Sequence, residues 1–171
     1  MARLRKNSAY QNLERPYTRI SKYSKQNYVR GGRPQVKIIK FDMGNPQKKF
    51  DTKYLLLSQK SMNIRHNALE SARMSSNRLL EKKIPGDYHL RIRVYPHHVL
   101  RENPLASGAG ADRMSTGMKL SYGKSIGTAA RVMEGQPLVE VNVNKLNSKI
   151  ARESLSRAAK KFPCSCKIVA K

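Results

Sequence analysis

The sequence predicts an α+β fold, in which a mainly antiparallel sheet has two helices packed on one side, together with a basic N-terminal arm and a long projecting loop. The first observation behind this class is the order of the segments, which is β-β-α-β-loop-β-β-α-β along the chain. The second is the number of helices, because two are too few to cover both faces of a parallel sheet. A chain of 171 residues, 39% of them hydrophobic, is long and apolar enough for one domain with a real core.

Residues 1–34 are predicted to form the arm, and residues 35–171 the single folded domain. The arm holds nine basic residues against one acid, Glu14, and four tyrosines are interleaved among them. It has too few apolar residues to fold alone, but it can order on a phosphate backbone while its rings stack on bases or riboses. A disordered, solubilising tail is the alternative. The arm residues expected to contact RNA are Arg3, Arg5, Lys6, Arg15, Tyr17, Arg19, Lys22, Arg30 and Arg33.

The first half of the domain is predicted to contain two strands and a helix. Residues 36–41 have the pattern of a strand that ends at a Gly-Asn-Pro turn, and the apolar run 54–57 predicts a second strand. The helix is predicted to start between residues 61 and 67 and to run to about residue 83, because small and apolar residues recur there at helical spacing. Pro85 and Gly86 then end it.

Residues 88–95 show the cleanest alternation, which predicts a strand with one face in the core. The other face carries a histidine, two arginines and a tyrosine, and this combination suits phosphates and sugars. A solvated charged face is the alternative. The RNA-contact candidates on this face are His89, Arg91 and Arg93.

The last part of the domain is predicted to add three strands and one helix. Strands are predicted at 128–133 and 138–143, a helix at about 148–161, and a final strand at 166–170. Arg131, in the first of these strands, is a further candidate for RNA contact.

Residues 101–127 have the pattern of neither a helix nor a strand. They hold five of the ten glycines, and their charged residues are mostly basic. A structureless insertion of this length in a compact domain normally indicates disorder or function. At about 3.4 Å per residue the chain could project at most roughly 45 Å. We expect a loop that enters an RNA-lined space and is held at its ends by the strands 88–95 and 128–133. The loop candidates are Arg101, Gly108, Gly110, Arg113, Lys119, Gly123, Lys124 and Gly127.

Charge is the strongest bulk signal. Thirty-five Lys and Arg against eleven Asp and Glu give a formal net charge of +24. Self-repulsion on that scale opposes folding, and a polyanion relieves it; nucleic acid is the usual one. A membrane surface is the competing partner, but no helix combines a basic face with a strong Trp/Phe face. Nucleic acid is therefore the expected partner.

No catalytic residues are expected. Residues 117–125 resemble a phosphate-binding loop, but five residues separate the glycines instead of four, and a strand rather than a helix is predicted to follow. A nucleotide-dependent enzyme using Lys124 and Ser125 is the competing enzyme hypothesis. The histidines accompany no nucleophile and no useful carboxylate pair. His97 and His98, at the loop entry, are therefore assigned to RNA contact.

The sequence predicts no metal site, no cofactor and no membrane anchor. Cys164 and Cys166 are spaced as C-x-C, which makes a strained disulfide and only half of a metal site. No apolar run approaches the roughly 20 residues of a transmembrane helix. The basic N-terminus lacks the apolar core of a signal peptide. These features favour a cytosolic protein.

Several motifs resemble one family. They are R-I-R-V-Y-P-H-H-V-L-R at 91–101, A-G-A-D-R-M-S-T-G-M at 109–118 and Y-G-K-S-I-G-T-A-A-R-V at 122–132, with F-D-M-G-N at 41–45 and A-L-E-S-A-R at 68–73. In this order they resemble the archaeal and eukaryotic large-subunit ribosomal protein ten-e, the counterpart of bacterial protein sixteen. The resemblance covers essentially the whole chain, and the short stretch after the last strand is similar to archaeal members.

The resemblance implies a structural, non-catalytic protein of the large ribosomal subunit. Family members bind large-subunit rRNA near the aminoacyl-tRNA site, beside other ribosomal proteins, and join the subunit late in assembly. Their long loop reaches toward the peptidyl-transferase centre and the acceptor arm of tRNA. By position, His98 and Arg101 are the loop entry, 108–113 its tip and 123–127 its return. No homo-oligomer is expected. The alternative is a free RNA chaperone or a non-specific nucleic-acid-binding protein.

Overall fold

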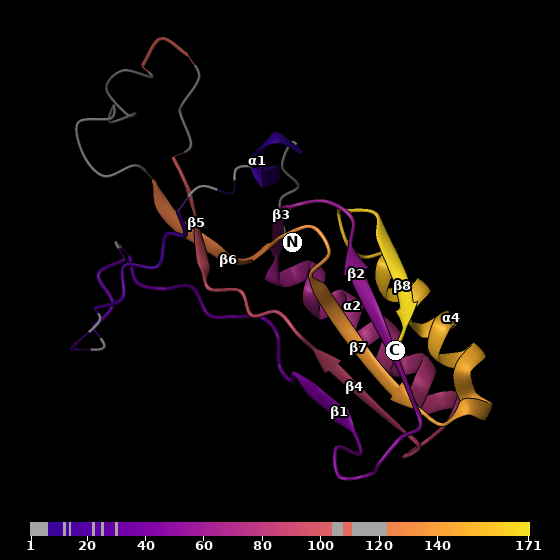
Figure 1. The fold of residues 1–171 in the computed structure, drawn as a ribbon. Coiled ribbons are helices and arrows are strands. Elements are labelled where there is room, and N and C mark those ends of the chain that lie inside the picture. The colour runs from indigo at the N-terminus through magenta and orange to yellow at the C-terminus, as the bar shows by residue number, and fades with distance from the viewer. Residues whose placement is uncertain are drawn as a thin grey trace.

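In the computed structural model, two antiparallel sheets and two long helices form an α+β fold, which confirms the predicted class (Figure 1). The two helices cover the larger sheet, and the smaller sheet extends away from it on the side where the arm lies. The residues that the structure describes are 7–11, 13, 15–21, 23–24, 26–29, 31–103, 108–110 and 123–171.

The larger sheet has five strands, and every neighbouring pair is antiparallel. In spatial order they are β1 (Asp42–Gly44), β4 (Tyr88–Ile92), β7 (Pro137–Val143), β2 (Thr52–Ser58) and β8 (Cys166–Ala170). β7 lies in the middle and is buried over most of its length, with Val139, Val141 and Val143 at most 1% exposed. This matches its run of valines at alternate positions.

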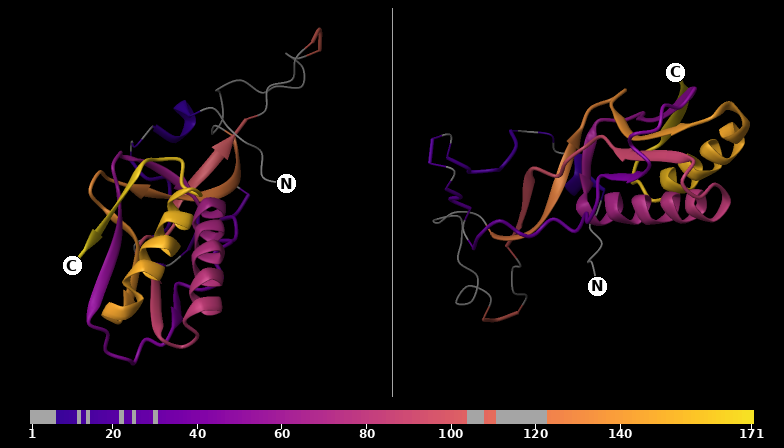
Figure 2. Two further views of the ribbon diagram at one scale, coloured as in Figure 1. Left: turned by 90° about the vertical axis from the view of Figure 1, so that its right-hand side faces the viewer. Right: turned by 90° about the horizontal axis from the view of Figure 1, so that it is seen from below.

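Two helices, α2 (His66–Lys83) and α4 (Ser148–Ala159), lie side by side on one face of this sheet, as predicted (Figure 2). Small residues on their inner sides allow a close approach. Ala72, Ala151 and Ala158 are fully buried. Ser76 is buried as well, and its hydroxyl donates to the Ala72 carbonyl oxygen at 2.8 Å, so no polar atom of that side chain is left unpaired in the core. In the described part of the chain there are also two short helical elements, α1 (Ser8–Gln11) and the 3₁₀ turn η1 (Lys145–Asn147).

The smaller sheet was not predicted as a separate unit. Its strands, in spatial order, are β3 (Met62–Arg65), β6 (Lys124–Val132) and β5 (His98–Glu102), all antiparallel. β3 leads directly into α2, so the smaller sheet is fixed to the helix layer by the chain itself. The connections from β4 to β5 and from β6 to β7 join the two sheets (Figure 1).

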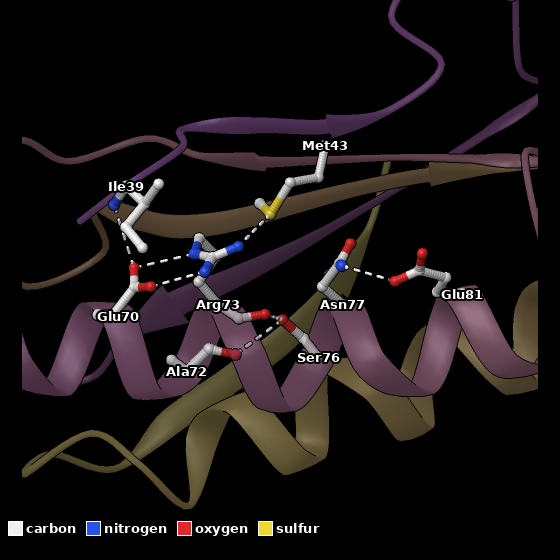
Figure 3. A network of polar contacts seen from close by, with 8 residues as sticks. All are labelled: Ile39, Met43, Glu70, Ala72, Arg73, Ser76, Asn77 and Glu81. Atoms are coloured by element: carbon white, nitrogen blue, oxygen red, sulfur yellow. Dashed lines mark hydrogen bonds and ion pairs between the residues drawn. The ribbon is translucent and has the colours of Figure 1, made fainter.

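The strand predicted over 36–41 is wrong, because residues 32–40 form no strand and the first strand is β1, over residues 42–44. The alternation itself is real: Ile38 is buried and Ile39 is exposed. The backbone amide of Ile39, however, donates to the Glu70 carboxylate of α2 at 3.4 Å instead of to a strand (Figure 3). Arg73 holds the same carboxylate through two hydrogen bonds of 2.8 and 2.6 Å. Side chains of the helix thus replace a partner strand.

The ends of the long loop also differ from the prediction. The strand predicted over 88–95 ends at Ile92, close to Pro96, which has no amide to donate. An additional strand, β5, begins at His98, just before the predicted loop, and extends into it. β6 begins at Lys124 rather than at residue 128. The loop is therefore held by β5 and β6, whose last pair is Glu102 and Lys124. Small residues made β6 look like loop, although its residues 127–130 are buried.

The remaining predicted elements are confirmed. β2, α2, β7, α4 and β8 all occur at the expected places, with α4 ending two residues early at Ala159. The thiols of Cys164 and Cys166 are free, and their sulfur atoms lie 3.9 Å apart. In the described part of the chain, no helix has the length and apolarity to cross a bilayer.

Candidate nucleic-acid interface

The described part of the arm is bound to the smaller sheet at Tyr17. The backbone amide of Tyr17 donates to Nδ1 of His98 at 2.8 Å, and the amide of Val99 donates to the Tyr17 carbonyl oxygen at 2.9 Å. The guanidinium carbon of Arg101 lies 3.8 Å from the centre of the Tyr17 ring, a cation–π contact. The structure therefore brings together Tyr17, His98 and Arg101, although Tyr17 is 81 positions from His98 in the sequence.

The imidazole of His98 is held neutral at this contact. Burial lowers its pKa, and the positive charges of Arg131 and Arg101 lower it further. A neutral ring with an unprotonated Nδ1 is the form that can accept the hydrogen bond from Tyr17. His98 therefore joins the arm to β5 through Nδ1, and its assignment to RNA contact stays a prediction.

Three further hydrogen bonds fix the arm to the strands and to the turn before β5. Arg131 of β6 donates to the Leu13 carbonyl oxygen at 2.7 Å, and the Ser125 hydroxyl donates to the Gly32 carbonyl oxygen at 2.9 Å. Arg33 donates to the Pro96 carbonyl oxygen at 3.2 Å. Arg131 and Arg33 thus each use one guanidinium nitrogen for a hydrogen bond within the protein. Each guanidinium has further N–H groups besides.

The close approach of the two loop ends requires a glycine at one of them. Gly123 has φ +67°, and a Cβ there would lie 2.7 Å from the backbone of Glu102, so only glycine fits this close approach of the two ends. Gly127 lies against the buried His66, whose Nε2 would be 3.5 Å from an added Cβ. Gly108 and Gly110 are exposed. Other predicted contacts lie outside the described residues: Arg3, Arg5, Lys6, Lys22, Arg30, Arg113 and Lys119.

The polar face of β4 is partly neutralised by two acids. Asp42 contacts Nε2 of His89 at 3.0 Å and Nε of Arg91 at 3.5 Å. The buried carboxylate of Glu140 pairs with Lys53 at 2.6 Å and Arg93 at 3.3 Å. The side chains of Arg91 and Arg93 nevertheless remain 50% and 43% exposed, whereas that of His89 is only 12% exposed. The two arginines are the available cations of this face.

An aromatic column is formed by Phe41, just before β1, and by two residues of the connection from β4 to β5. The rings of Phe41 and Tyr95 stack with centroids 5.3 Å apart, and the ring of His97 lies 4.5 Å from that of Tyr95, tilted by 45° to it. The guanidinium of Arg33 lies over Tyr95 at 5.8 Å. Sequence reasoning assigned His97 and Arg33 to RNA contact and placed Tyr95 on the polar face of its predicted strand without naming it a contact residue, but it missed Phe41. A tyrosine and a phenylalanine beside basic residues were the available signal.

The geometry around Lys124 does not fit a phosphate-binding loop. Gly123 leads straight into β6, which runs to Val132, so no helix N-terminus follows the glycine. Within the described residues, moreover, no group of three or more His, Cys, Asp or Glu side chains converges in a way that could hold a metal ion. The candidate interface consists of basic and aromatic side chains.

Comparison with known proteins shows which family the chain belongs to. Residues 18–169 match the family described as Ribosomal protein L16p/L10e. The chain belongs to this family. It is 48% identical to the large ribosomal subunit protein uL16 of Staphylothermus marinus, over 92% of this chain and 91% of that protein. It is 44% identical to the proteins of the same description from Methanococcus maripaludis strain S2 and Methanospirillum hungatei, over 97% and 95% of this chain and 93% of each relative.

Membership in the L16p/L10e family confirms the resemblance seen in the motifs, including its archaeal character. Proteins of this family are structural parts of the ribosome and not enzymes, which excludes the nucleotide-dependent alternative. The chain is accordingly a structural constituent of the large ribosomal subunit in the cytoplasm.

Proposed function

We propose that this L16p/L10e protein binds large-subunit rRNA near the aminoacyl-tRNA site and directs its glycine-rich loop toward the peptidyl-transferase centre and tRNA. In this proposal, residues 1–34 act as an RNA-binding arm on a single domain, 35–171. Neighbouring ribosomal proteins complete its surroundings, and its binding supports translation and late subunit assembly.

The observation that supports rRNA binding is the joining of the arm, β5 and β6 into one basic surface, which we name the arm–sheet surface. Its cations are Arg15, Arg19, Arg33, Arg101, Lys124 and Arg131. Among the described residues of these three segments, Glu102 is the only acid. Because a cluster of cations with so little internal neutralisation attracts phosphate, the arm–sheet surface is suited to an RNA backbone.

The proposed role of the loop rests on how its ends are held. The pairing of Glu102 with Lys124 fixes both ends on a sheet, and the arm bonds β5 and β6 from the side. A glycine-containing loop on such a base can approach phosphates and sugars closely, since it lacks Cβ atoms at those positions. Specific RNA recognition mostly uses irregular, unpaired regions, which a loop of this kind can enter.

We expect alanine at Arg15, Arg19 and Lys124 together to release the protein from large subunits at lower salt than the wild-type chain. Each phosphate that the variant no longer binds should flatten the slope of log K against log salt by about 0.7 to 0.9. The measurement is sedimentation of large subunits through sucrose gradients of rising salt, with detection of this protein. The matched control is alanine at Lys160, Lys161 and Lys167, three exposed cations at the end of α4 and on β8. Equal release of both triple variants would contradict the arm–sheet surface as the site.

We expect replacement of residues 104–122 by a two-residue turn to leave the fold intact, because the strands on either side pair with each other. Subunit maturation or translation should fall nevertheless. Growth and subunit profiles of a strain that carries only this variant test the expectation, with thermal unfolding of the purified protein as the control for folding. Normal growth would show that the loop has no part in function.

A free RNA chaperone or non-specific nucleic-acid-binding protein is the alternative that the net charge of +24 alone would also allow, but membership in a ribosomal-protein family favours the ribosomal role. The two differ in selectivity and in location. A chaperone would bind unrelated RNA as tightly as large-subunit rRNA and would stay at the top of the gradient.

A further inference from the structure

Hydrogen bonds of the backbone hold the Phe41–Tyr95–His97 column in place. The carbonyl oxygen of Phe41 accepts a hydrogen bond of 2.9 Å from the Ile92 amide, which ties that end to the strand β4. The amide of His97 donates to the Tyr95 carbonyl oxygen at 3.0 Å, so the chain makes a tight turn around Pro96 and places both rings on one side. The bond from Arg33 to the Pro96 carbonyl oxygen fixes the same turn from the arm.

The column is also exposed where a core cluster would be covered. Tyr95 is 41% exposed although Phe41 and His97 pack against it, and His97 itself is exposed. Phe41 is half-buried and anchors the other end. Stacked rings that are held in place but left open to solvent stabilise the fold less than buried ones would. The outermost ring, that of His97, is tilted by 45° to the Tyr95 ring and provides a preformed aromatic face for a ligand instead.

The charge state of His97 suits stacking. Although His97 is exposed overall, the partial desolvation of its ring lowers its pKa, and the positive charge of Arg33 lowers it further, so the imidazole is neutral at neutral pH. The positive charge of this corner therefore comes from Arg33, which lies over the Tyr95 ring at 5.8 Å. A neutral ring at the exposed end of the column and a cation beside it match the two parts of a nucleotide, its base and its phosphate.

We propose that the Phe41–Tyr95–His97 column binds one unpaired nucleobase, which stacks on the exposed His97 end while Arg33 faces the attached phosphate. This inference rests on the proposed function, since it names the kind of contact that the protein makes with rRNA. An unpaired base is the favoured ligand because every base has a flat π face and irregular rRNA offers bases that are not stacked internally. His97 thereby gains a role distinct from that of the neighbouring His98, which holds the arm.

The test compares His97→Ala with His97→Phe in filter binding to large-subunit rRNA extracted from the organism that encodes the protein. His97→Ala should weaken binding by about 5- to 100-fold, because the variant cannot stack on the base. The slope of log K against log salt should not change, since a neutral ring releases no counterion. His97→Phe keeps a flat ring and should bind within about threefold of wild type. Since His97 is exposed, both variants are expected to fold, which thermal unfolding checks.

The outcomes separate this inference from the proposed function. If the wild-type chain binds large-subunit rRNA no better than an unrelated RNA of equal length, the proposed function fails and the inference with it. If the wild type is selective but His97→Ala binds equally well, the inference alone is wrong. Weaker binding by His97→Ala together with a salt slope flattened by about 0.7 to 0.9 indicates a phosphate contact and overturns stacking. A His97→Phe variant as weak as His97→Ala indicates an imidazole hydrogen bond and overturns it too.

Discussion

Replacing Gly44 by alanine is expected to lower the free energy of unfolding by at least about 3 kcal/mol. Gly44 has φ +83°, a left-handed conformation that alanine adopts only under strain. An added Cβ would also lie 2.1 Å from the carbonyl oxygen of Tyr88, which is backbone of the paired strand β4. That oxygen accepts a hydrogen bond of 2.9 Å from the Asn45 amide, so it cannot move away without breaking the end of the sheet.

Gly86→Ala is the matched control. Gly86 has φ +74° and no atom within 4 Å of the added Cβ, so its variant bears the backbone strain without the collision. It should lower the free energy of unfolding by only about 1 to 2 kcal/mol. Urea denaturation of both variants, followed by circular dichroism, measures the difference. Equal destabilisation at the two positions would show that the approach of Gly44 to β4 does not constrain the fold.

Replacing Glu140 by glutamine is expected to lower stability at neutral pH and to flatten the acid limb of the stability curve. Glu140 is only 4% exposed and pairs with Lys53 at 2.6 Å and Arg93 at 3.3 Å. Burial by itself raises the pKa of this carboxyl, but the hydrogen bond and charge of Lys53, a hydrogen bond from Asn142 and the charge of Arg93 together bring it below the ordinary value. The expected destabilisation is about 1 to 3 kcal/mol, toward the lower end because both cations are more than one-third exposed and can be hydrated.

The sign of the pH effect follows from the lowered pKa. The folded state binds the proton of Glu140 less readily than the unfolded state, whose carboxyl titrates near 4.5. The stabilisation is therefore fully present above about pH 4.5 and is lost as the pH falls through the lower folded value. Chemical denaturation at a series of pH values from about 7 to about 3 should show a shallower decline for Glu140→Gln than for wild type.

Glu153→Gln serves as the control for this experiment. Its carboxylate also pairs with two cations, Lys83 and Arg157, but on an exposed helix surface. Because solvent screens such pairs, the variant should follow the wild-type curve closely. A Glu153→Gln curve as flat as that of Glu140→Gln would mean that burial of Glu140 is not the reason for its effect.

The sequence predicted most of the elements that have a single strong pattern. The valines of β7 and the small-residue stripe of α2 were sufficient because each repeats at the period of its own structure, and β2 was found as a short continuous apolar run. The alternating pattern over 36–41 wrongly predicted a strand, and the reason is physical. Alternating burial of Ile38 and Ile39 does not require a strand when a helix carboxylate, Glu70, can accept the backbone hydrogen bond.

The candidate surface was predicted in part by composition. Basic residues of the arm and of the predicted strands were found because charge is visible in the sequence at each position. The contact partners of these residues were not predicted, because they lie far away in the sequence: Tyr17 contacts His98, 81 positions away, and Arg131 contacts Leu13, 118 positions away. For the same reason the prediction gave His97 and His98 one common role, whereas the structure places His97 in an aromatic column and His98 against the arm.

By itself, the sequence determined the fold class, the two helices on one side of an antiparallel sheet, the net charge and the family, because these depend on local periodicity, on composition and on contiguous motifs. Only the tertiary structure decided that a second sheet of β3, β6 and β5 holds the loop, that the arm lies on that sheet, and which cations are already paired. These features depend on contacts between segments that are far apart in the chain. Small residues such as those at 127–130 form a buried strand only because β3, β5 and the start of α2 surround them.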